Sequence, residues 1–433
     1  REAGVNERER AFLALRRVER QASRIDFAVE ANEGDSDRGF LLTVVRGVVR
    51  WRPRLDFAIE TLSGRNIESI DPDVATLLRS ALYQLLEMDA PSYAVVNEHV
   101  TIAANRFPRA KGFVNAVLRK ATRVPADALV PDEGDAKARE VATGHPDWLL
   151  RRWIDQFGEE RALRIAAADQ EPSYPDLLVN TARISMEEAA KLLAERSVVA
   201  EASPFGIPVF RLRGPVGEVR EEIERGLFHP MDEGSAIIAG LVEPERSVLD
   251  LAAAPGGKSL AMALRGARVV SHDLSLARLG MLRAAHPRFF GGAPKIVVGD
   301  GRALPFRKPF DVVLLDAPCS ATGTLRKNPE VKLRLEEKDL AAYATLQLEL
   351  LRAAASIASR EIIYSTCSLE REENAGVVDA FLAGDSGFER FDLASRVPPP
   401  LASAVRDGAL VLTPDLGTDG FAASGLRRRG SLS

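Results

Sequence analysis

The chain has 433 residues, of which 46% are hydrophobic and 28% are charged, and its formal net charge is -4. This length predicts two or three domains, each large enough to bury a core. Two cysteines exclude a disulfide framework and indicate a reducing compartment. Because no apolar stretch reaches the roughly 18 residues of a membrane span, we expect a cytoplasmic protein with no membrane partner.

The first 125 residues show helical periodicity and no strand pattern. Apolar residues recur at helical spacing in segments 11–21, 40–51, 55–62, 74–88, 94–107 and 112–122. Several short helices without strands predict a compact all-α bundle over residues 1–125.

Charge in this first part favours an RNA partner. Residues 1–125 contain 20 Lys and Arg and 17 Asp and Glu, a small positive excess that by itself is typical of a solvated helical surface. Four arginines, however, fall within nine residues between Arg46 and Arg54, with Trp51 among them. Guanidinium groups beside an aromatic ring are typical of an RNA-binding surface, so we expect this cluster to face RNA.

The remainder divides into three parts. Residues 126–146 are rich in Pro, Asp and Gly, which predicts a linker. Residues 147–235 combine helical patterns with two short strand patterns and predict a small α+β unit. Residues 236–433 alternate short apolar runs with helices, which predicts parallel strands in a Rossmann-like α/β domain. The expected strands lie in segments 247–254, 267–273, 294–300, 310–318 and 359–367.

Small residues and acids follow these predicted strands. The loop from Ala252 to Lys258 opens a helix, where backbone N–H groups can approach a ligand closely. It lacks the spacing of a dinucleotide fingerprint and of a phosphate-binding P-loop. Four acids close four strands, and ligands of open α/β sheets bind at that edge. The pattern favours a nucleoside-type cofactor, S-adenosylmethionine rather than a dinucleotide. The four acids are Asp250, Asp273, Asp300 and Asp316.

Both cysteines also follow predicted strands at this edge. A lone cysteine in an apolar run is usually a buried small hydrophobic residue. Here that interpretation would have to be true of two cysteines at the same predicted site, which favours a chemical role for them. Metal binding is not expected, because neither Cys319 nor Cys367 belongs to a C-x-x-C pair and the five histidines are scattered.

A thiolate beside a methyl donor is what methylation of pyrimidine carbon 5 requires. The thiolate adds to carbon 6 and makes carbon 5 nucleophilic, and a base then removes the carbon-5 proton. The residues alone leave open which thiol attacks, because Pro318-Cys319 is similar to the nucleophile pair of DNA cytosine methyltransferases.

The motifs resemble a known family. Segments 316–332 (DAPCSATGTLRKNPEVK), 364–374 (YSTCSLEREEN) and 251–258 (LAAAPGGK) are similar to those of RNA (cytosine-5)-methyltransferases. Segments 38–62, 77–89, 94–103 and 111–120 resemble the NusB-like RNA-binding domain that precedes the bacterial 16S rRNA enzyme, and segment 418–429 resembles the closing strand of the family. The resemblance implies a 16S rRNA cytosine-C5 methyltransferase that uses S-adenosylmethionine, with free or partly assembled small-subunit RNA as partner. We expect it to act as a monomer.

The resemblance also assigns roles to residues. It makes Cys367 the nucleophile and Cys319 the residue that assists release, while Asp316 binds the cytosine edge. It places Asp273 at the ribose and Asp300 at the adenine. Arg326 and Asn328 are expected to hold the target nucleotide. The methionine part of the cofactor is expected to contact Ala252, Ala253, Ala254, Pro255, Gly256, Gly257 and Lys258, of which Lys258 also reaches the base.

Three positions depart from the usual pattern of the family, which often has Gln at Met231, Cys at Ala252 and Trp at Leu333. Two other functions compete with a methyltransferase. One is an RNA-binding or ribosome-assembly factor with an inactive methyltransferase domain, against which both retained thiols argue. The other is a nicotinamide dehydrogenase, against which the missing dinucleotide fingerprint argues.

Overall fold

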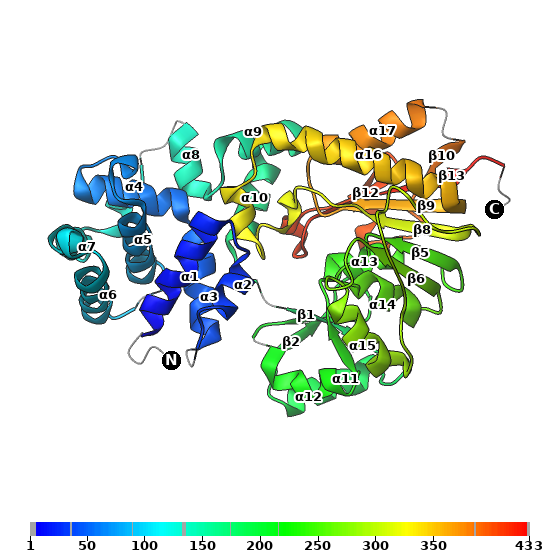
Figure 1. Ribbon diagram of the computed structural model, residues 1–433, viewed down its shortest axis with the longest axis horizontal. Coiled ribbons are helices and arrows are strands. Elements are labelled where there is room, and N and C mark those ends of the chain that lie inside the picture. The colour runs from blue at the N-terminus through cyan, green and yellow to red at the C-terminus, as the bar shows by residue number, and fades with distance from the viewer. Residues whose placement is uncertain are drawn as a thin grey trace. The chain divides into compact units, whose positions relative to one another are not determined.

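The computed structural model describes residues 6–34, 37–88, 90–131, 136–173, 175–214, 216–384 and 387–430. The chain forms two compact units (Figure 1). The helical unit comprises Arg1–Glu171 together with Leu325–Leu335, and the α/β unit comprises Pro172–Thr324 and Glu336–Ser433. The segment Leu325–Leu335 therefore leaves the α/β unit, packs within the helical unit and returns.

The helical unit confirms the predicted bundle. Phe12, Leu41, Leu77 and Val114 are fully buried in one apolar core, which explains the helical spacing of the apolar residues. The helices are α1 (Glu7–Gln21), α2 (Ile25–Glu30), α3 (Arg38–Arg50), α4 (Arg52–Ser63), α5 (Pro72–Leu86), α6 (Ser92–Arg106), α7 (Lys111–Ala121), α8 (Ala136–Thr143), α9 (Asp147–Phe157) and α10 (Glu159–Gln170).

Three of these helices differ from the expected organisation. Helix α8 lies inside the predicted linker, of which residues 132–135 are outside the described residues. Its two buried residues, Ala138 and Val141, are too few to produce a helical pattern. Helices α9 and α10 were expected in the small α+β unit, but they pack with the helical unit, where Trp153 is fully buried.

That the arginine cluster at 46–54 faces RNA remains a prediction, and the structure shows that its arginines also contact neighbouring groups within the helical unit. The guanidinium of Arg50 is buried and donates to the carbonyl oxygen of Arg326 at 2.9 Å. The other three arginines lie beside carboxylates, which neutralise their charge within the unit. The pairs are Arg46–Asp26 at 2.9 Å, Arg52–Asp56 at 3.6 Å and Arg54–Glu87 at 3.3 Å.

The α/β unit begins with a small antiparallel sheet in the order β2-β3-β1-β4. Helix α11 packs on it and starts with a capping box, in which Ser185 and Glu188 satisfy each other's backbone N–H groups. This part confirms the predicted α+β unit. Its elements are β1 (Asp176–Val179), α11 (Met186–Glu195), β2 (Ala200–Ala202), β3 (Val209–Leu212), α12 (Arg220–Glu224) and β4 (Phe228–Pro230).

The larger sheet has the order β11-β12-β13-β9-β8-β5-β6-β7, and β10 pairs with β13. The five predicted strands, β5 to β9, are parallel, as expected. Strand β13 joins antiparallel to β9, in agreement with the predicted closing strand. These strands are β5 (Ser247–Leu251), β6 (Arg268–Asp273), β7 (Lys295–Val298), β8 (Phe310–Asp316), β9 (Ala358–Thr366), β10 (Phe388–Phe391), β11 (Val405–Arg406), β12 (Ala409–Leu412) and β13 (Phe421–Arg428).

Helices cover both faces of this sheet (Figure 1). Val248 and Leu249 are consecutive on β5, and they enter two different cores because strand side chains alternate between faces. One core includes α13 (Glu233–Gly240) and α14 (Gly257–Leu264), while α15 (Gly280–Phe290) packs beside α14. The other core includes α16 (Leu340–Ile357) and α17 (Ala375–Ala383). All five parallel strands therefore present their carboxyl ends at one edge.

Candidate active site

The four predicted acids lie at or close to the carboxyl ends of their strands, as expected. Asp250 is next to last in β5, and Asp273 and Asp316 end β6 and β8. Asp250 and Asp316 line the same cavity of about 200 Å³. Neither Asp273 nor Asp300 lines this cavity. Asp300 is exposed and pairs with Arg302, whose hydrogen bonds hold the pKa of Asp300 at about 2.

The cavity lies over the loop that joins β5 to α14. Gly256 has φ +106°, and a Cβ there would lie 2.3 Å from the Cβ of Leu282, so only glycine fits. Met231, one of the departures from the family pattern, also lines the cavity. The full lining is His229, Pro230, Met231, Asp232, Ser235, Asp250, Ala252, Ala253, Ala254, Pro255, Gly257, Lys258, Met281 and Asp316.

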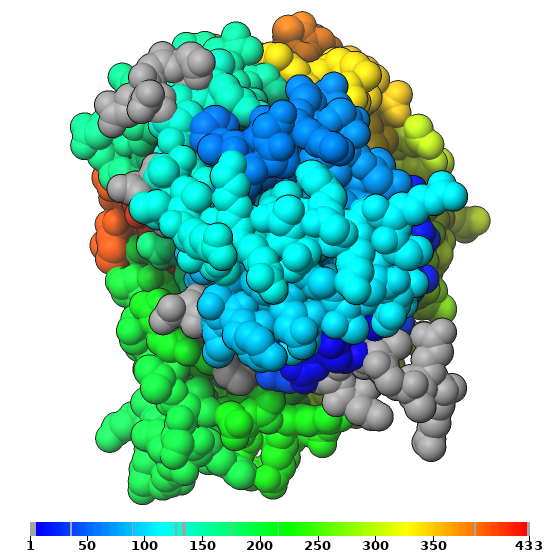
Figure 2. Space-filling model, turned by 90° about the vertical axis from the view of Figure 1, so that its left-hand side faces the viewer, coloured from blue at the N-terminus to red at the C-terminus, as the bar shows by residue number. Residues whose placement is uncertain are grey.

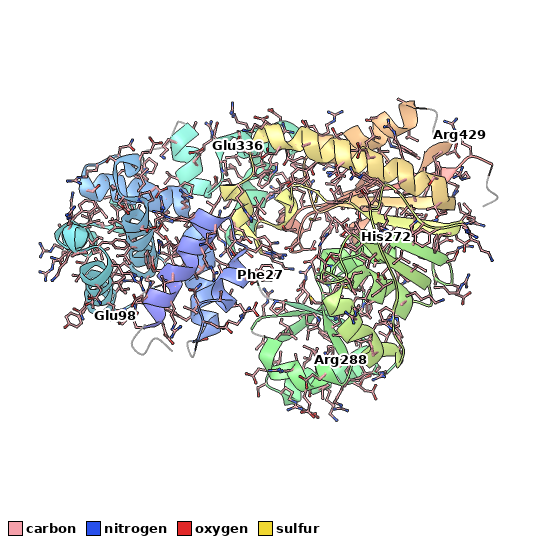
Figure 3. The ribbon with its side chains drawn as sticks, in the orientation of Figure 1. Phe27, Glu98, His272, Arg288, Glu336 and Arg429 are labelled. Atoms are coloured by element: carbon pink, nitrogen blue, oxygen red, sulfur yellow. The ribbon has the colours of Figure 1, made fainter. Side chains whose placement is uncertain are left out.

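Two buried acids form hydrogen bonds with this loop and with the first turn of α14. The buried Asp273 accepts from the backbone N–H of Ala254 at 3.1 Å, and Arg278 lies 3.3 Å from its other oxygen. Asp250 is fully buried and accepts from Ser259 at 2.5 Å, while its second oxygen has no hydrogen-bond partner among the described residues. Burial raises the pKa of Asp250 to about 7. His272, labelled in Figure 3, precedes Asp273 on β6 and is also buried.

Lys258 and Asp316 form a half-buried ion pair at the mouth of the cavity. The ammonium of Lys258 donates to Asp316 at 2.8 Å and to Ser235 at 3.2 Å. Ser365 donates to the other oxygen of Asp316 at 2.9 Å, as their pairing across β8 and β9 allows. Burial lowers the pKa of Lys258, but the carboxylate of Asp316 more than offsets this effect, and the net shift is upward. Lys258 is therefore a permanent cation at this site.

The structure brings the two cysteines together. Their sulfur atoms lie 3.3 Å apart, although 47 residues separate them in the chain. Backbone hydrogen bonds join their loops: Ala317 donates to the carbonyl of Ser365 at 2.8 Å, and Gly323 donates to the carbonyl of Cys367 at 2.9 Å. The hydrogen bond with Cys367 and burial raise the pKa of Cys319 well above its ordinary value.

The charges around the two sulfur atoms differ. The ammonium of Lys258 interacts electrostatically with Cys367, whereas the carboxylate of Glu373 acts on Cys319 and contributes to its raised pKa. A cation favours a thiolate and an anion disfavours one. The raised pKa of Cys319 disfavours its thiolate, and the role of Cys367 as nucleophile remains a prediction.

Glu373 is a site residue that the sequence prediction missed. It is fully buried, and it accepts hydrogen bonds from the backbone and hydroxyl of Ser320, from Ser368 and from Gln347. Ser320 and Ser368 directly follow the two cysteines, so one carboxylate ties both loops together. No sequence pattern distinguishes Glu373 from the neighbouring Glu370 and Glu372; only its contacts do.

Arg326 and Asn328 do not lie in the unit that carries the thiols. Both belong to Leu325–Leu335, which packs within the helical unit. In that segment Lys332 donates to the carbonyl oxygens of Arg50 and Gly144, at 3.2 and 2.8 Å. Leu333, a departure from the family pattern, packs against the helical core. A role of Arg326 and Asn328 toward a substrate remains a prediction.

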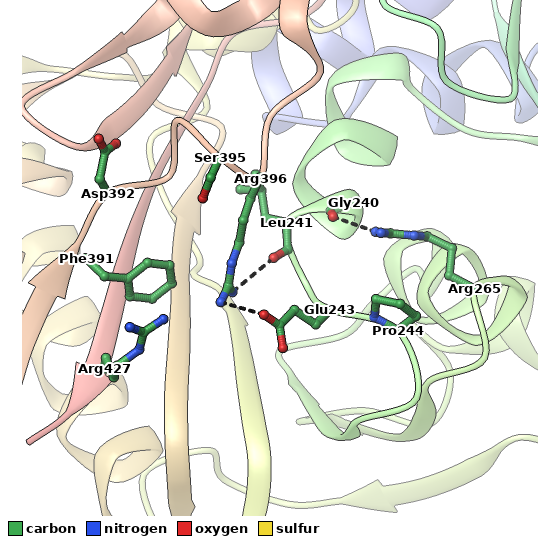
Figure 4. Close-up of a pocket in the computed structure, with 10 residues that line it drawn as sticks. All are labelled: Gly240, Leu241, Glu243, Pro244, Arg265, Phe391, Asp392, Ser395, Arg396 and Arg427. Atoms are coloured by element: carbon green, nitrogen blue, oxygen red, sulfur yellow. Dashed lines mark hydrogen bonds and ion pairs between the residues drawn. The ribbon is translucent and has the colours of Figure 1, made fainter. Parts of the chain in front are cut away.

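A second cavity of about 540 Å³ lies at the opposite edge of the large sheet (Figure 4). Arg396 enters it and pairs with Glu243 at 3.1 Å and with Glu361 at 2.7 Å. Neither thiol lines this cavity or the cavity of about 200 Å³. Across the described segments, no group of three or more possible metal ligands occurs, and no helix is long and apolar enough to span a bilayer.

Family models match three parts of the chain. Residues 5–123 match the NusB family, and residues 145–218 match the ferredoxin-like domain of RsmF/B-like methyltransferases. Residues 237–427 match "16S rRNA methyltransferase RsmB/F". The ferredoxin-like match includes α9 and α10, whereas contacts within the fold place these helices in the helical unit.

Whole-length relatives agree with these matches. The ribosomal RNA small subunit methyltransferase B of Pseudomonas syringae is 35% identical, covering 89% of this chain and 88% of its own length. The protein of the same name from Thermus thermophilus is 33% identical, covering 83% of this chain and 81% of its own length.

Solved structures share the fold. A crystal structure titled PH0851 covers 97% of this chain and 98% of its own, at 23% identity and a TM-score of 0.80. A methyltransferase homolog from Pyrococcus horikoshii covers 67% and 97%, at 25% identity and a TM-score of 0.56. The architecture and the whole-length relatives agree: the chain belongs to the RsmB/F family of 16S rRNA methyltransferases.

Proposed function

We propose that this family member methylates carbon 5 of a cytosine in 16S rRNA, with S-adenosylmethionine as the methyl donor. The observation that carries the proposal is the pair of thiols, 3.3 Å apart, beside the Lys258–Asp316 ion pair. Methylation at an oxygen or at an exocyclic nitrogen has no need of a thiolate, whereas carbon 5 becomes nucleophilic only after a nucleophile adds to carbon 6.

The residues around the cavity suit the proposed donor. S-adenosylmethionine, when bound, supplies an electrophilic methyl group. The loop Ala252–Gly257 offers backbone N–H groups and no bulky side chain, and Gly256 keeps the helix start close to the loop. We assign Asp273 to the ribose hydroxyls, because its carboxylate is held beside this loop. Asp300 is assigned to the adenine side, although its carboxylate is paired with Arg302.

The first step forms a bond between the sulfur of Cys367 and carbon 6. The π electrons of the C5–C6 bond move to carbon 5, and the ring gains negative charge. Lys258 and Asp316 would contact the ring edge, where the ammonium stabilises this charge. The target cytosine must leave its stack to expose carbon 6, so we expect an extruded or single-stranded base.

Release requires a base, and Cys319 becomes one during the reaction. While Cys367 is a thiolate, its sulfur raises the pKa of Cys319. Once Cys367 is bonded to carbon 6 it carries no charge, so the pKa of Cys319 falls and its proton can leave to solvent. Carbon 5 uses its electron pair to take the methyl group, and the bonding pair of that methyl group stays on the sulfur of the donor. The Cys319 thiolate then removes the proton that remains on carbon 5, the C5=C6 bond re-forms, and Cys367 departs as a thiolate. The same base cannot form too early, because its pKa depends on the state of Cys367.

The experiment compares Cys319→Ala and Cys367→Ala with the native protein on unmodified 16S rRNA and S-adenosylmethionine. Covalent protein–RNA adducts are measured on denaturing gels, and methyl transfer to carbon 5 is measured by mass spectrometry of nucleosides. We expect Cys319→Ala to accumulate an adduct and Cys367→Ala to form none.

The opposite pattern would make Cys319 the nucleophile, as in the arrangement of DNA enzymes. Methyl groups found at a position other than carbon 5, with no adduct in either variant, would refute the proposed chemistry.

A further inference from the structure

A long stretch of the helical unit contains no acidic residue. Between Glu98, labelled in Figure 3, and Asp127 the chain carries six basic residues and not one Asp or Glu. This stretch contains the end of α6, the whole of α7 and the turn between them. The six are Arg106, Arg109, Lys111, Arg119, Lys120 and Arg123.

Most of these charges have no counter-charge. Arg106 pairs with Glu9 at 2.6 Å, but the other five are exposed and form no ion pair within the described part of the chain. Arg119 donates to the side chain of Asn115, and Lys120 to the carbonyl of Leu62, both neutral acceptors. The contrast with residues 46–54 is direct, because there the arginines are buried or paired with carboxylates.

The five residues lie on α7 or directly beside its ends, and Arg65 lies next to the same helix. Helix α7 buries Val114, Val117, Leu118 and Ala121, so Arg119 lies on its opposite, solvent-facing side, with the exposed Lys111 and Lys120 on the two flanks. Arg65 joins them from the turn after α4, where its guanidinium lies 4.9 Å from the ring centre of Phe113. Figure 2 shows this face, with the cyan atoms of α6 and α7 across its middle. We call Arg65, Arg109, Lys111, Arg119, Lys120 and Arg123 the α7 surface.

We infer that the α7 surface binds phosphate groups of the rRNA substrate, an inference that rests on the proposed function. These six exposed cations pair with no carboxylate of the described residues, so their positive potential attracts a polyanion, although the chain as a whole is acidic, with a net charge of -4. Four of the six are arginines, whose planar guanidinium matches phosphate oxygens in pairs. Phosphate contacts of this kind position an RNA without reading its sequence.

An anionic membrane fits this surface less well. Helices that lie on membranes insert apolar side chains beside their basic ones. No large hydrophobic side chain is exposed between residues 99 and 125, all of which the structure describes. Helix α7 is about 16 Å long, which suits a short stretch of one RNA strand.

The test reverses three charges on the full-length protein, as Lys111→Glu/Arg119→Glu/Arg123→Glu. The matched control is Lys295→Glu/Lys308→Glu/Arg352→Glu, which changes the net charge equally. In the control, Lys295 and Lys308 are exposed at the edge of the large sheet where the parallel strands begin, and Arg352 is exposed on α16. Binding of unmodified 16S rRNA is measured over a range of salt concentrations, together with kcat and KM for methyl transfer and the melting temperature.

We expect the α7 triple variant to bind RNA about tenfold or more weakly than the control, and its salt slope to fall by about 2, at about 0.7 per lost contact to a single strand. The loss should appear in KM for RNA, with the melting temperature equal to that of the control. Equal affinity and equal salt slope in both variants would overturn the inference, as would selective loss of binding to phosphatidylglycerol vesicles with RNA binding intact. Failure of the proposed function is distinguishable, because the native protein would then bind RNA without methylating carbon 5.

Discussion

Glu373→Gln isolates the charge of the carboxylate that joins the two cysteine loops. Glutamine has nearly the same shape, and its carbonyl oxygen can still accept from the backbone of Ser320 and from Gln347. The hydroxyls of Ser320 and Ser368 can rotate to accept from the new amide. The substitution therefore changes four charge-assisted hydrogen bonds into neutral ones, and each of these partner groups can keep a hydrogen bond to residue 373.

The magnitude follows from those four bonds. A hydrogen bond to a charged group contributes about 1.5–3 kcal/mol to stability and a neutral one about 0.5–1.5, so each exchange costs about 1 kcal/mol. Because the four bonds share one carboxylate and are not additive, we expect a loss of about 2–4 kcal/mol in the free energy of unfolding. The loss of charge also removes one cause of the raised pKa of Cys319, which should fall.

Three measurements follow these effects. Urea denaturation gives the free energy of unfolding, and the rate of Cys319 alkylation by iodoacetamide against pH gives its pKa in a Cys367→Ala background. Methyl transfer in single turnover should slow, with KM for RNA unchanged. The control is Glu372→Gln, which alters an exposed neighbour. Equal stability, equal alkylation profiles and equal transfer rates in the two variants would refute the reasoning.

Three further outcomes follow from the structure. Burial raises the pKa of Asp250 from 3.8 to about 7, so the native state binds more protons than the unfolded state between these two pH values. The free energy of unfolding of the native protein, relative to that of Asp250→Asn, should therefore fall by up to about 4 kcal/mol as pH rises from 4 to 7. The same pH dependence in both proteins, measured by urea denaturation, would contradict this. Gly323→Ala would place a Cβ 2.4 Å from a backbone carbonyl of the loop before β13. We expect this variant to lose about 1–3 kcal/mol in the free energy of unfolding, and to lose methyl transfer as well. Gly292→Ala, where a Cβ meets open space, should equal the native protein in thermal melts and in methyl transfer. Dilute hydrogen peroxide should oxidise one thiol to a sulfenic acid, and the other thiol should then attack that sulfur, forming a disulfide with loss of water. Mass spectrometry should find Cys319 bonded to Cys367, and dithiothreitol should restore activity. Peroxide-treated protein with two free thiols and full activity would exclude this.

The sequence by itself determined the order of helical, α+β and α/β parts, because helical spacing and short apolar runs depend only on which side chains face a core. It also placed Asp273 and Asp316 at strand ends and both cysteines just beyond their strands. A parallel sheet brings all carboxyl ends to one edge, so those predictions needed no coordinates.

Tertiary structure alone decided which charges are free and which are shared. Arg50 and Lys111 are both basic residues on helices, yet Arg50 is buried against a carbonyl, whereas Lys111 is exposed and has no counter-charge among the described residues. Glu373 differs from Glu372 only in facing two loops that meet from distant parts of the chain. Whether a charge is paired depends on contacts between residues far apart in sequence, and local patterns carry no record of such contacts.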